Sequence, residues 1–396
     1  MNTRNLRIAL ICDGVAEFMA GSTESARRFS RILKGRGYTQ VFIAGRSPEH
    51  RTDDEWEGMK VYRFRSFLLP QTDGHLYLGL PRKREVIKIL QEERIDILHV
   101  IMPTPAAIAA VRAAHAIGIP VVVHSHTQPE NLFLNTFHNK AEWFTNILSS
   151  LMYVYLHWLY AKVAVLIFPT KFSREFFKGL PQKSRTEVIS NGVDRTKFGK
   201  ADPAPLLKKF NLPADRTYIL FVGRLHPEKR VDTLIAAMPA ILKGAPGAHA
   251  LIVGGGHREQ ALRAQAASLG ITERVSFLGR LSDAEVEQAY NAAALFVLPS
   301  LVELEGMVVL QAISCGVPVL VSNSPKSASP LLVEGNGLLF KPSDAADLAA
   351  QALAILTNPE RRKSMAAQSL LLGEKYDIQT SASKIESIYH SLMSTR

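Results

Sequence analysis

Two carboxylates stand beside a predicted helix start in the stretch that runs from Leu298 to Ser322. The stretch reads as the end of a buried strand, a loop with Glu303 and Glu305, a helix beginning near Gly306, and a second buried strand. Carboxylates accept hydrogen bonds from sugar hydroxyls, and backbone N–H groups at a helix start bind phosphate. Open α/β sheets place their ligands at such loops. The stretch therefore predicts a site for a sugar phosphate or a nucleotide sugar.

A second candidate site is the sequence GRLHPEK, from Gly223 to Lys229, which follows another buried strand. Its glycine lets the backbone turn, and Arg224 and Lys229 place two cations near the carboxyl end of the strand. Arginine can form a fork of hydrogen bonds to phosphate oxygens, and lysine adds a point charge. Taken alone, a strand followed by Gly and Arg is often only a solvated loop.

Two further candidates lie in the first half of the chain. HSHT, from His124 to Thr127, ends a buried strand, and strand alternation puts His124 and His126 on one face. No Glu or Cys at ligand spacing supports a zinc site there, and a structural buried histidine is the alternative. Gly21 precedes the first predicted helix, where Ser22 is the expected N-cap and the backbone can approach a ligand.

Segments of strand and helix character alternate along the whole chain, which predicts βαβ units and parallel sheets. We expect an α/β protein with two Rossmann-like, doubly wound domains facing each other across a cleft that holds the active site. The predicted divisions are an N-terminal acceptor-binding domain (1–195), a linker (196–213), a C-terminal nucleotide-sugar-binding domain (214–370) and a C-terminal helix (371–396) that packs back toward the N-terminal domain.

Length and composition agree with two globular domains, because 396 residues exceed one ordinary core and 47% of them are hydrophobic. The apolar run from Ile8 to Cys12 is too short for a signal peptide and reads as a first core strand. Cys12 and Cys315 lie in predicted core elements without disulfide or metal spacing. A reducing cytoplasm is therefore the expected compartment.

The positive charge is concentrated in the first half of the chain. Residues 1–200 hold 28 Lys and Arg against 18 Asp and Glu, whereas the whole chain has a net charge of +11. Such asymmetry favours an acidic partner, either nucleic acid or anionic lipid, although a solvated basic face without a partner is the plain alternative. No nucleic-acid recognition motif supports the first, and the basic residues lie on several separate helices.

GRLHPEK, VSFLGRLSD and PSLVELEGMVVLQAISCGVPVL, in this order, resemble the retaining glycosyltransferases of family four, which have the GT-B fold. HSHT and the Gly21 loop match the N-terminal domain of that family, so the resemblance covers essentially the whole chain. It implies a hexosyltransferase that uses a nucleotide sugar as co-substrate, with a UDP-sugar favoured over a GDP-sugar. It also implies no cofactor and no metal site.

The resemblance also implies the roles of the four catalytic candidates. Arg224 and Lys229 would neutralise the leaving diphosphate, Glu303 would bind the hydroxyls of the donor sugar, and His126 would contact the sugar from the N-terminal domain.

Donor-binding positions follow from the same resemblance. Backbone N–H groups at the helix start would meet the phosphates, the segment after another strand would contact the base, and two glycine loops would approach the diphosphate. These positions are Gly21, Gly223, Leu278, Arg280, Gly306, Met307 and Val308.

One position departs from the family pattern. A second glutamate, eight positions after the first, holds the nucleotide ribose in the family, and here that position is Gln311. Glutamine keeps an acceptor oxygen and adds a donor, so ribose binding can survive without the charge-assisted bond. A weakened or inactive enzyme is the alternative interpretation.

The acceptor predicted from the ELEG form of the motif is a lipid, because this form resembles glycolipid synthases that glycosylate diacylglycerol or similar lipids. Three segments fit an enzyme attached peripherally to the cytoplasmic face of an anionic membrane. They are a first helix with Arg27, Arg31 and Lys34, a second helix with Arg82, Lys83, Arg84 and Lys88, and a helix at 141–160 with Trp143, Ile147, Leu151, Val154 and Trp158 at helical spacing.

Core packing is the alternative explanation of that apolar spacing, and a helix followed by a buried strand explains residues 147–169 better than a membrane span. A soluble sugar or polysaccharide acceptor, a non-catalytic sugar-nucleotide binder and a nucleic-acid-binding protein stay open. The oligomeric state is not indicated by the sequence.

Overall fold

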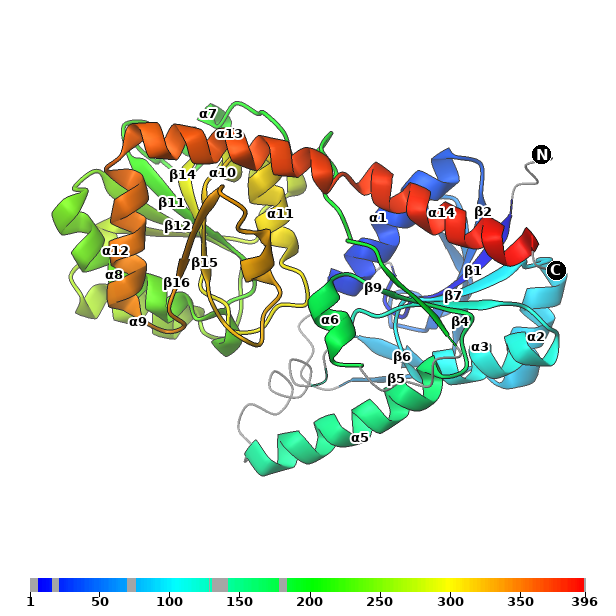
Figure 1. Ribbon diagram of the computed structural model, residues 1–396. Coiled ribbons are helices and arrows are strands. Elements are labelled where there is room, and N and C mark those ends of the chain that lie inside the picture. Colours follow the sequence, from blue (N-terminus) through cyan, green and yellow to red (C-terminus); the bar gives the residue numbers. More distant parts are fainter. Residues whose placement is uncertain are drawn as a thin grey trace. The chain divides into compact units, whose positions relative to one another are not determined.

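The computed structural model forms two compact units, each shown in Figure 1. Unit 1 comprises Met1–Asn191 and Gln379–Arg396, and unit 2 comprises Gly192–Ile378. The described residues are 6–15, 21–69, 76–127, 129, 142–177 and 184–394. The segment 196–213, expected as a linker, belongs to unit 2 and contains helix α7 (Ala204–Lys209).

Unit 1 is built on an eight-stranded sheet in the order β10-β9-β8-β7-β1-β2-β4-β3, in which only the edge pair β3–β4 is antiparallel. The strands are β1 (Arg7–Ile11), β2 (Thr39–Gly45), β3 (Asp54–Trp56), β4 (Met59–Phe64), β7 (Ile97–Val100), β8 (Val121–His124), β9 (Val165–Phe168) and β10 (Arg185–Val188). The central parallel strands are continuous apolar runs, because helices cover both faces of such a sheet. β5 (Ser66–Leu68) and β6 (Tyr77–Gly79) form a separate antiparallel pair.

The helices of unit 1 bury one face each against this sheet. They are α1 (Gly21–Gly35), α2 (Lys83–Glu92), α3 (Pro105–Ala116), α5 (Glu142–Tyr160), the short α6 (Lys171–Glu175) and α14 (Ile378–Ser394), the last of which starts at the boundary of unit 2. α1 begins at Gly21, so Ser22 lies inside the helix instead of capping it. A shift of one residue at a helix end is ordinary.

α14 returns the chain to unit 1 and is tied to it by polar contacts as well as apolar burial. Tyr389 Oη lies 2.6 Å from His99 Nδ1 on β7, and Tyr38 Oη lies 2.9 Å from His390 Nε2. Arg36 forms an ion pair with Glu386. The C-terminal helix thus completes the core of the unit that the N-terminal residues begin.

Unit 2 is built on a six-stranded, fully parallel sheet in the order β13-β12-β11-β14-β15-β16. Its strands are β11 (Thr217–Val222), β12 (Ala248–Val253), β13 (Val275–Gly279), β14 (Ala293–Leu298), β15 (Val319–Ser322) and β16 (Gly337–Phe340). The helices that accompany them are α7, α8 (Val231–Gly244), α9 (Glu259–Ser268), α10 (Asp283–Ala292), α11 (Met307–Ser314), α12 (Ala345–Leu356) and α13 (Pro359–Lys375).

These two sheets confirm the predicted α/β class with two doubly wound parallel-sheet domains. The segment 147–169 is the end of α5 followed by β9, as expected. None of the helices among the described residues combines the length and the apolar character that crossing a bilayer requires. β3, β5 and β6 were not predicted, since three-residue strands are too short to show alternation.

Candidate active site

The loops after β11 and β14 lie at the topological switch point of unit 2. β11 pairs with β12 on one side and with β14 on the other, and the chain order reverses between β11 and β14. Ligands of doubly wound sheets bind outside the carboxyl ends of the strands at this point. The segment from Gly223 to Lys229 leaves β11 here, and the segment from Pro299 to Gly306 leaves β14.

Lys229 and Glu303, predicted from separate motifs, are in direct contact. Lys229 Nζ lies 2.6 Å from Glu303 Oε1, and the two side chains are only 13% and 14% exposed. A backbone hydrogen bond of 2.8 Å, from Leu301 N–H to the Glu228 carbonyl, joins the same two loops. The site therefore presents a cation and a carboxylate as one unit, with little solvent around them.

Arg224, the second predicted cation, lies beside a carboxylate that the sequence analysis did not single out. Arg224 Nη2 is 3.8 Å from Glu228 Oε1, and the arginine side chain is 44% exposed whereas the glutamate is 6% exposed. Arg224 thus presents its guanidinium to solvent at the carboxyl end of β11.

Gly306 forms the entry to α11 and is required by the fold. Its φ of 97° lies in the left-handed region, and a Cβ there would be 2.4 Å from Ser329 Oγ. The N–H groups of Met307 and Val308 have no acceptor within the helix, whereas Val309 N–H donates to the Gly306 carbonyl at 2.8 Å. Phosphate binding at this helix start stays a prediction, and Glu305 is buried instead of facing the loop surface.

The remaining donor-binding candidates lie around this edge of unit 2. Leu278 is buried in β13, and Arg280, just after that strand, is exposed. Gln311 is 9% exposed in the second turn of α11, and its Oε1 accepts a hydrogen bond of 3.0 Å from Tyr290 Oη.

In unit 1, His126 stands at the end of a line of three histidines. The His124 and His126 rings are 4.2 Å apart, and His99 stacks on His124 at 6.1 Å, with ring planes 6° apart. Burial lowers the pKa of His99 to about 3 and that of His126 to about 4, so all three rings are neutral at pH 7. Among the described residues, no group of His, Cys, Asp and Glu has the geometry to hold a metal ion.

Asp13, which lies just after the carboxyl end of β1 in unit 1, was not predicted from the sequence. Its Oδ1 accepts hydrogen bonds from the backbone N–H groups of Gly45 (2.7 Å) and Gly79 (3.1 Å). Burial raises the pKa of this carboxyl to about 6, although these donors, the Thr104 hydroxyl and Arg63 act in the opposite direction. No motif marks a lone aspartate after a strand, so only the structure reveals it.

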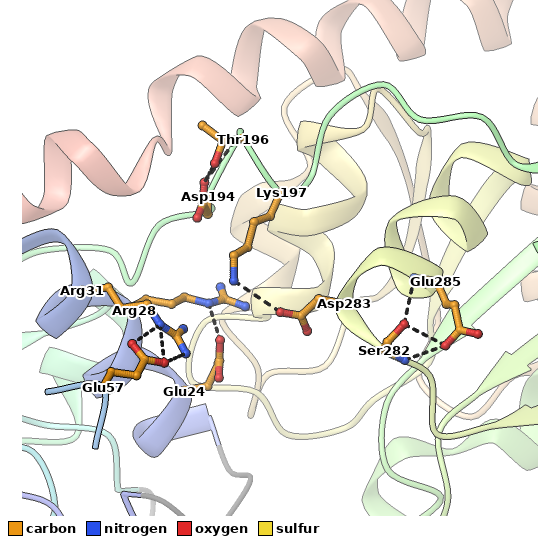
Figure 2. Close-up of polar contacts among 10 residues, drawn as sticks. All are labelled: Glu24, Arg28, Arg31, Glu57, Asp194, Thr196, Lys197, Ser282, Asp283 and Glu285. Atoms are coloured by element: carbon orange, nitrogen blue, oxygen red, sulfur yellow. Dashed lines mark hydrogen bonds and ion pairs between the residues drawn. The ribbon is translucent and has the colours of Figure 1, made fainter. Parts of the chain in front are cut away.

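The basic stripe expected on α1 does not form as a free surface. Arg27 is buried and donates from Nε to the Val15 carbonyl at 2.7 Å. Arg28 Nε lies 2.8 Å from Glu24 Oε1, and Arg31 Nη2 lies 2.6 Å from Glu57 Oε1 (Figure 2). The expectation that Arg27 contributes to a membrane surface was wrong, because charge spacing alone does not show which face of a helix is covered.

Gly21 and Gly306 differ in whether the fold itself requires a glycine, so the two alanine variants can be compared. Gly306→Ala should lower the stability of unit 2 by about 2 kcal/mol, because the side chain meets both a left-handed backbone and Ser329. At Gly21, an added Cβ meets nothing within 4 Å among the described residues, so Gly21→Ala should change stability by less than about 0.5 kcal/mol.

If Gly21 approaches the donor, its alanine variant should still lose turnover. Calorimetric unfolding and nucleotide release measure the two effects separately. A Gly21→Ala variant with unchanged turnover would remove Gly21 from the donor site.

Comparisons with known proteins identify the family and the fold. A family model described as Glycosyltransferase Family 4 matches residues 19–197, and one described as Glycosyl transferases group 1 matches residues 205–370. The solved structure of sucrose-phosphate synthase from Thermosynechococcus elongatus aligns with a TM-score of 0.79 over 99% of this chain and 100% of that one, at 18% identity. The chain is a family-four glycosyltransferase with the GT-B fold.

Relatives of this glycosyltransferase include enzymes with different acceptors. The phosphatidyl-myo-inositol mannosyltransferase of Mycolicibacterium smegmatis is 25% identical over 98% of this chain and 94% of the relative. The D-inositol 3-phosphate glycosyltransferase of Nocardia farcinica is 32% identical, but over 48% of this chain and 43% of the relative. An Anabaena protein solved with UDP-glucose shares the fold of the glycosyltransferase, with a TM-score of 0.74 at 19% identity over 98% of this chain and 100% of that one.

Proposed function

We propose that this glycosyltransferase moves a hexose from a nucleotide sugar, preferably a UDP-sugar, to a lipid acceptor at the cytoplasmic face of a membrane. The observation that carries the donor half is the contact between Lys229 and Glu303 beside the start of α11. In this proposal the lysine binds the donor phosphate and the glutamate binds hydroxyls of the same donor sugar. The UDP-glucose bound to the Anabaena protein supports the choice of base.

The proposed reaction retains the configuration at the sugar carbon and needs no metal ion. The bond between that carbon and the donor phosphate breaks as the acceptor oxygen bonds to the carbon from the same side. The acceptor proton passes to the leaving phosphate. Arg224 and Lys229 stabilise the negative charge that develops on the diphosphate, which is the task a divalent cation performs elsewhere.

The other predicted residues take binding roles in this proposal. The exposed sequence around Arg280 and the backbone at Leu278 contact the base, and Gln311 donates to the ribose. His126 keeps its predicted role as a sugar-binding residue, and its lowered pKa makes the imidazole neutral at pH 7. Gly21 leaves room for the diphosphate.

The lipid half of the proposal rests on an exposed row of apolar side chains along α5, the helix labelled at the lower edge of unit 1 in Figure 1. Four large side chains spaced by three or four positions face solvent, with exposures between 50% and 70%: Trp143, Ile147, Leu151 and Val154. Core packing, the alternative explanation, is excluded for these four, while Leu156, Leu159 and Tyr160 bury the opposite face. A helix with one face in the core and an apolar row outside fits insertion at a membrane interface.

Basic residues supply the electrostatic part of that attachment. Arg82, Lys83, Arg84 and Lys88, at and within α2, are exposed. Anionic lipid attracts such clusters, and each cation near the surface adds about 1 kcal/mol. The mannosyltransferase that matches most of the chain has a phosphatidylinositol acceptor in its name, which supports the lipid reading.

Vesicle flotation tests the row on α5. The triple change Trp143→Ser, Leu151→Ser and Val154→Ser should weaken binding to anionic phosphatidylglycerol vesicles by about 100-fold, since each side chain gives up roughly 1 kcal/mol of apolar burial. The matched control is Leu331→Ser with Leu371→Ser, two exposed leucines of unit 2, which should leave binding unchanged. Wild-type protein that does not float with vesicles would end the lipid proposal.

A soluble phosphorylated acceptor is the second candidate, favoured by the match to the D-inositol 3-phosphate enzyme over about half the chain. A donor screen decides between the two. Nucleotide release from UDP-glucose, UDP-galactose and GDP-mannose is measured with lipid vesicles or with inositol phosphate, with and without EDTA. Release that depends on vesicles, survives EDTA and disappears in Glu303→Gln supports the proposal. Release with inositol phosphate alone supports the soluble acceptor.

A further inference from the structure

Glu228 is a buried carboxylate that the proposed reaction does not use. Its side chain is 6% exposed, and among the described residues neither carboxylate oxygen has a hydrogen-bond donor. Burying a charged carboxylate without such donors is unfavourable, so its presence beside the donor site needs an explanation. The nearest cation is Arg224, with Nη2 at 3.8 Å from Oε1.

The two side chains differ in their freedom. Glu228 is held in a short turn, Pro227–Lys229, and its carbonyl accepts a hydrogen bond from Leu301 N–H at 2.8 Å. Arg224 is 44% exposed and has no other carboxylate beside it among the described residues. The fixed partner is therefore the glutamate, and the side chain that can be oriented is the arginine.

A guanidinium can serve two anions at once, because its five N–H groups point outward in a plane. One edge directed at Glu228 leaves another edge for phosphate oxygens at the carboxyl end of β11. Lys229, the next residue, contacts a different carboxylate, Glu303. Each of the two cations of the site thus has its own carboxylate, Glu228 for Arg224 and Glu303 for Lys229.

We propose that Glu228 is a positioning residue that holds the Arg224 guanidinium in the orientation that binds the second phosphate of the donor. This inference rests on the proposed function, since it assumes a nucleoside diphosphate ligand. Glu228 itself touches no substrate. It acts through Arg224, so its effect should vanish when the arginine is absent.

The probes are UDP and UMP, whose difference is the phosphate that Arg224 would hold. In wild-type protein, UDP should bind at least about 30-fold more tightly than UMP. Glu228→Gln keeps the shape of the side chain and removes the charge. In the Glu228→Gln protein, UDP should bind no more than about threefold more tightly than UMP, and the affinity for UMP should be unchanged. A destabilised fold would weaken both ligands together instead.

A double-mutant cycle with Arg224→Ala completes the test. Adding Glu228→Gln to Arg224→Ala should change neither the preference for UDP nor the turnover number, whereas Glu228→Gln alone should lower turnover by about 30-fold with a smaller change in KM. The inference is overturned if the Glu228→Gln protein still prefers UDP over UMP as strongly as wild type. It is also overturned if Glu228→Gln lowers that preference as much in the Arg224→Ala protein as in wild type. The proposed function stands in either case. Wild-type protein that binds neither UDP nor GDP overturns both. The matched control is Glu259→Gln, a change at a half-exposed glutamate of unit 2 that pairs with Arg263.

Discussion

Lys229→Met should lower the stability of unit 2 by about 3 kcal/mol and abolish transfer. Its ammonium lies 2.6 Å from Glu303, and the pair is almost buried, so removing the lysine leaves a carboxylate without its counter-charge in a poorly solvated loop. Glu303→Gln should cost less stability, because a glutamine can still accept a hydrogen bond from the ammonium, although transfer should still be lost. The same two residues would thus hold the loops together and bind the donor.

The double variant Lys229→Met, Glu303→Gln separates these roles. It removes both charges, so most of the lost stability should return while transfer stays absent. The control is Lys375→Met, which breaks the exposed pair with Glu334 and should cost less than about 1 kcal/mol. A double variant as unstable as Lys229→Met alone would contradict the explanation.

The sequence provides a way to assign the loss to one unit. The only tryptophans, Trp56, Trp143 and Trp158, all belong to unit 1. Tryptophan fluorescence therefore follows unit 1, whereas calorimetry records both units. The Lys229→Met loss should appear in calorimetry and leave the fluorescence transition in place.

Asp13→Asn should stabilise unit 1 at neutral pH and not in acid. Burial raises the pKa of Asp13 from 3.8 to about 6, so the folded chain holds this proton more tightly than the unfolded chain. The stability linked to Asp13 is full below about pH 4 and is lost as the pH rises through about 6. The advantage of Asp13→Asn over wild type should therefore be about 2 kcal/mol larger at pH 7.5 than at pH 4.5.

The buried histidines make stability depend on pH in the opposite direction, in wild type and in the Asp13→Asn variant alike. The pKa of His99 and of His126 is lowered from 6.5, so their stability is full above about 6.5 and is lost as the pH falls. Comparing the variant with wild type at each pH cancels this background. Urea unfolding followed by tryptophan fluorescence gives both free energies, and Glu49→Gln, at an exposed site, is the control. An advantage that is equal at both pH values would contradict the assignment.

The sequence predicted the features of the candidate site that depend on chain order. Parallel strands bring their carboxyl ends to one edge, so the motifs around Lys229 and Glu303 had to lie near each other. Their direct ion pair and the burial of Glu228 depend on side-chain packing, which a motif does not contain. Gln311 is similar, because its contact with Tyr290 comes from a different helix.

Exposure was the hardest property to predict. Apolar spacing on a helix normally marks a buried face, and on α5 it marks an exposed one at Trp143 and Leu151. Conversely, Arg27 was expected outside and is buried. Periodicity shows that a helix has two faces, but neighbouring elements decide which of them meets water.

The return of α14 to unit 1 also sets the order in which the two units can be completed on the ribosome. Unit 2 is an unbroken run of chain, so all of its strands are available before α14 has been synthesised. Unit 1 begins first, but His99 and Tyr38 meet their partners on α14 only after that helix has emerged. Domains usually fold in the order of synthesis. Here unit 1 is synthesised first but can complete its fold only after unit 2 has been synthesised. Until then the surface that α14 covers is exposed to chaperones.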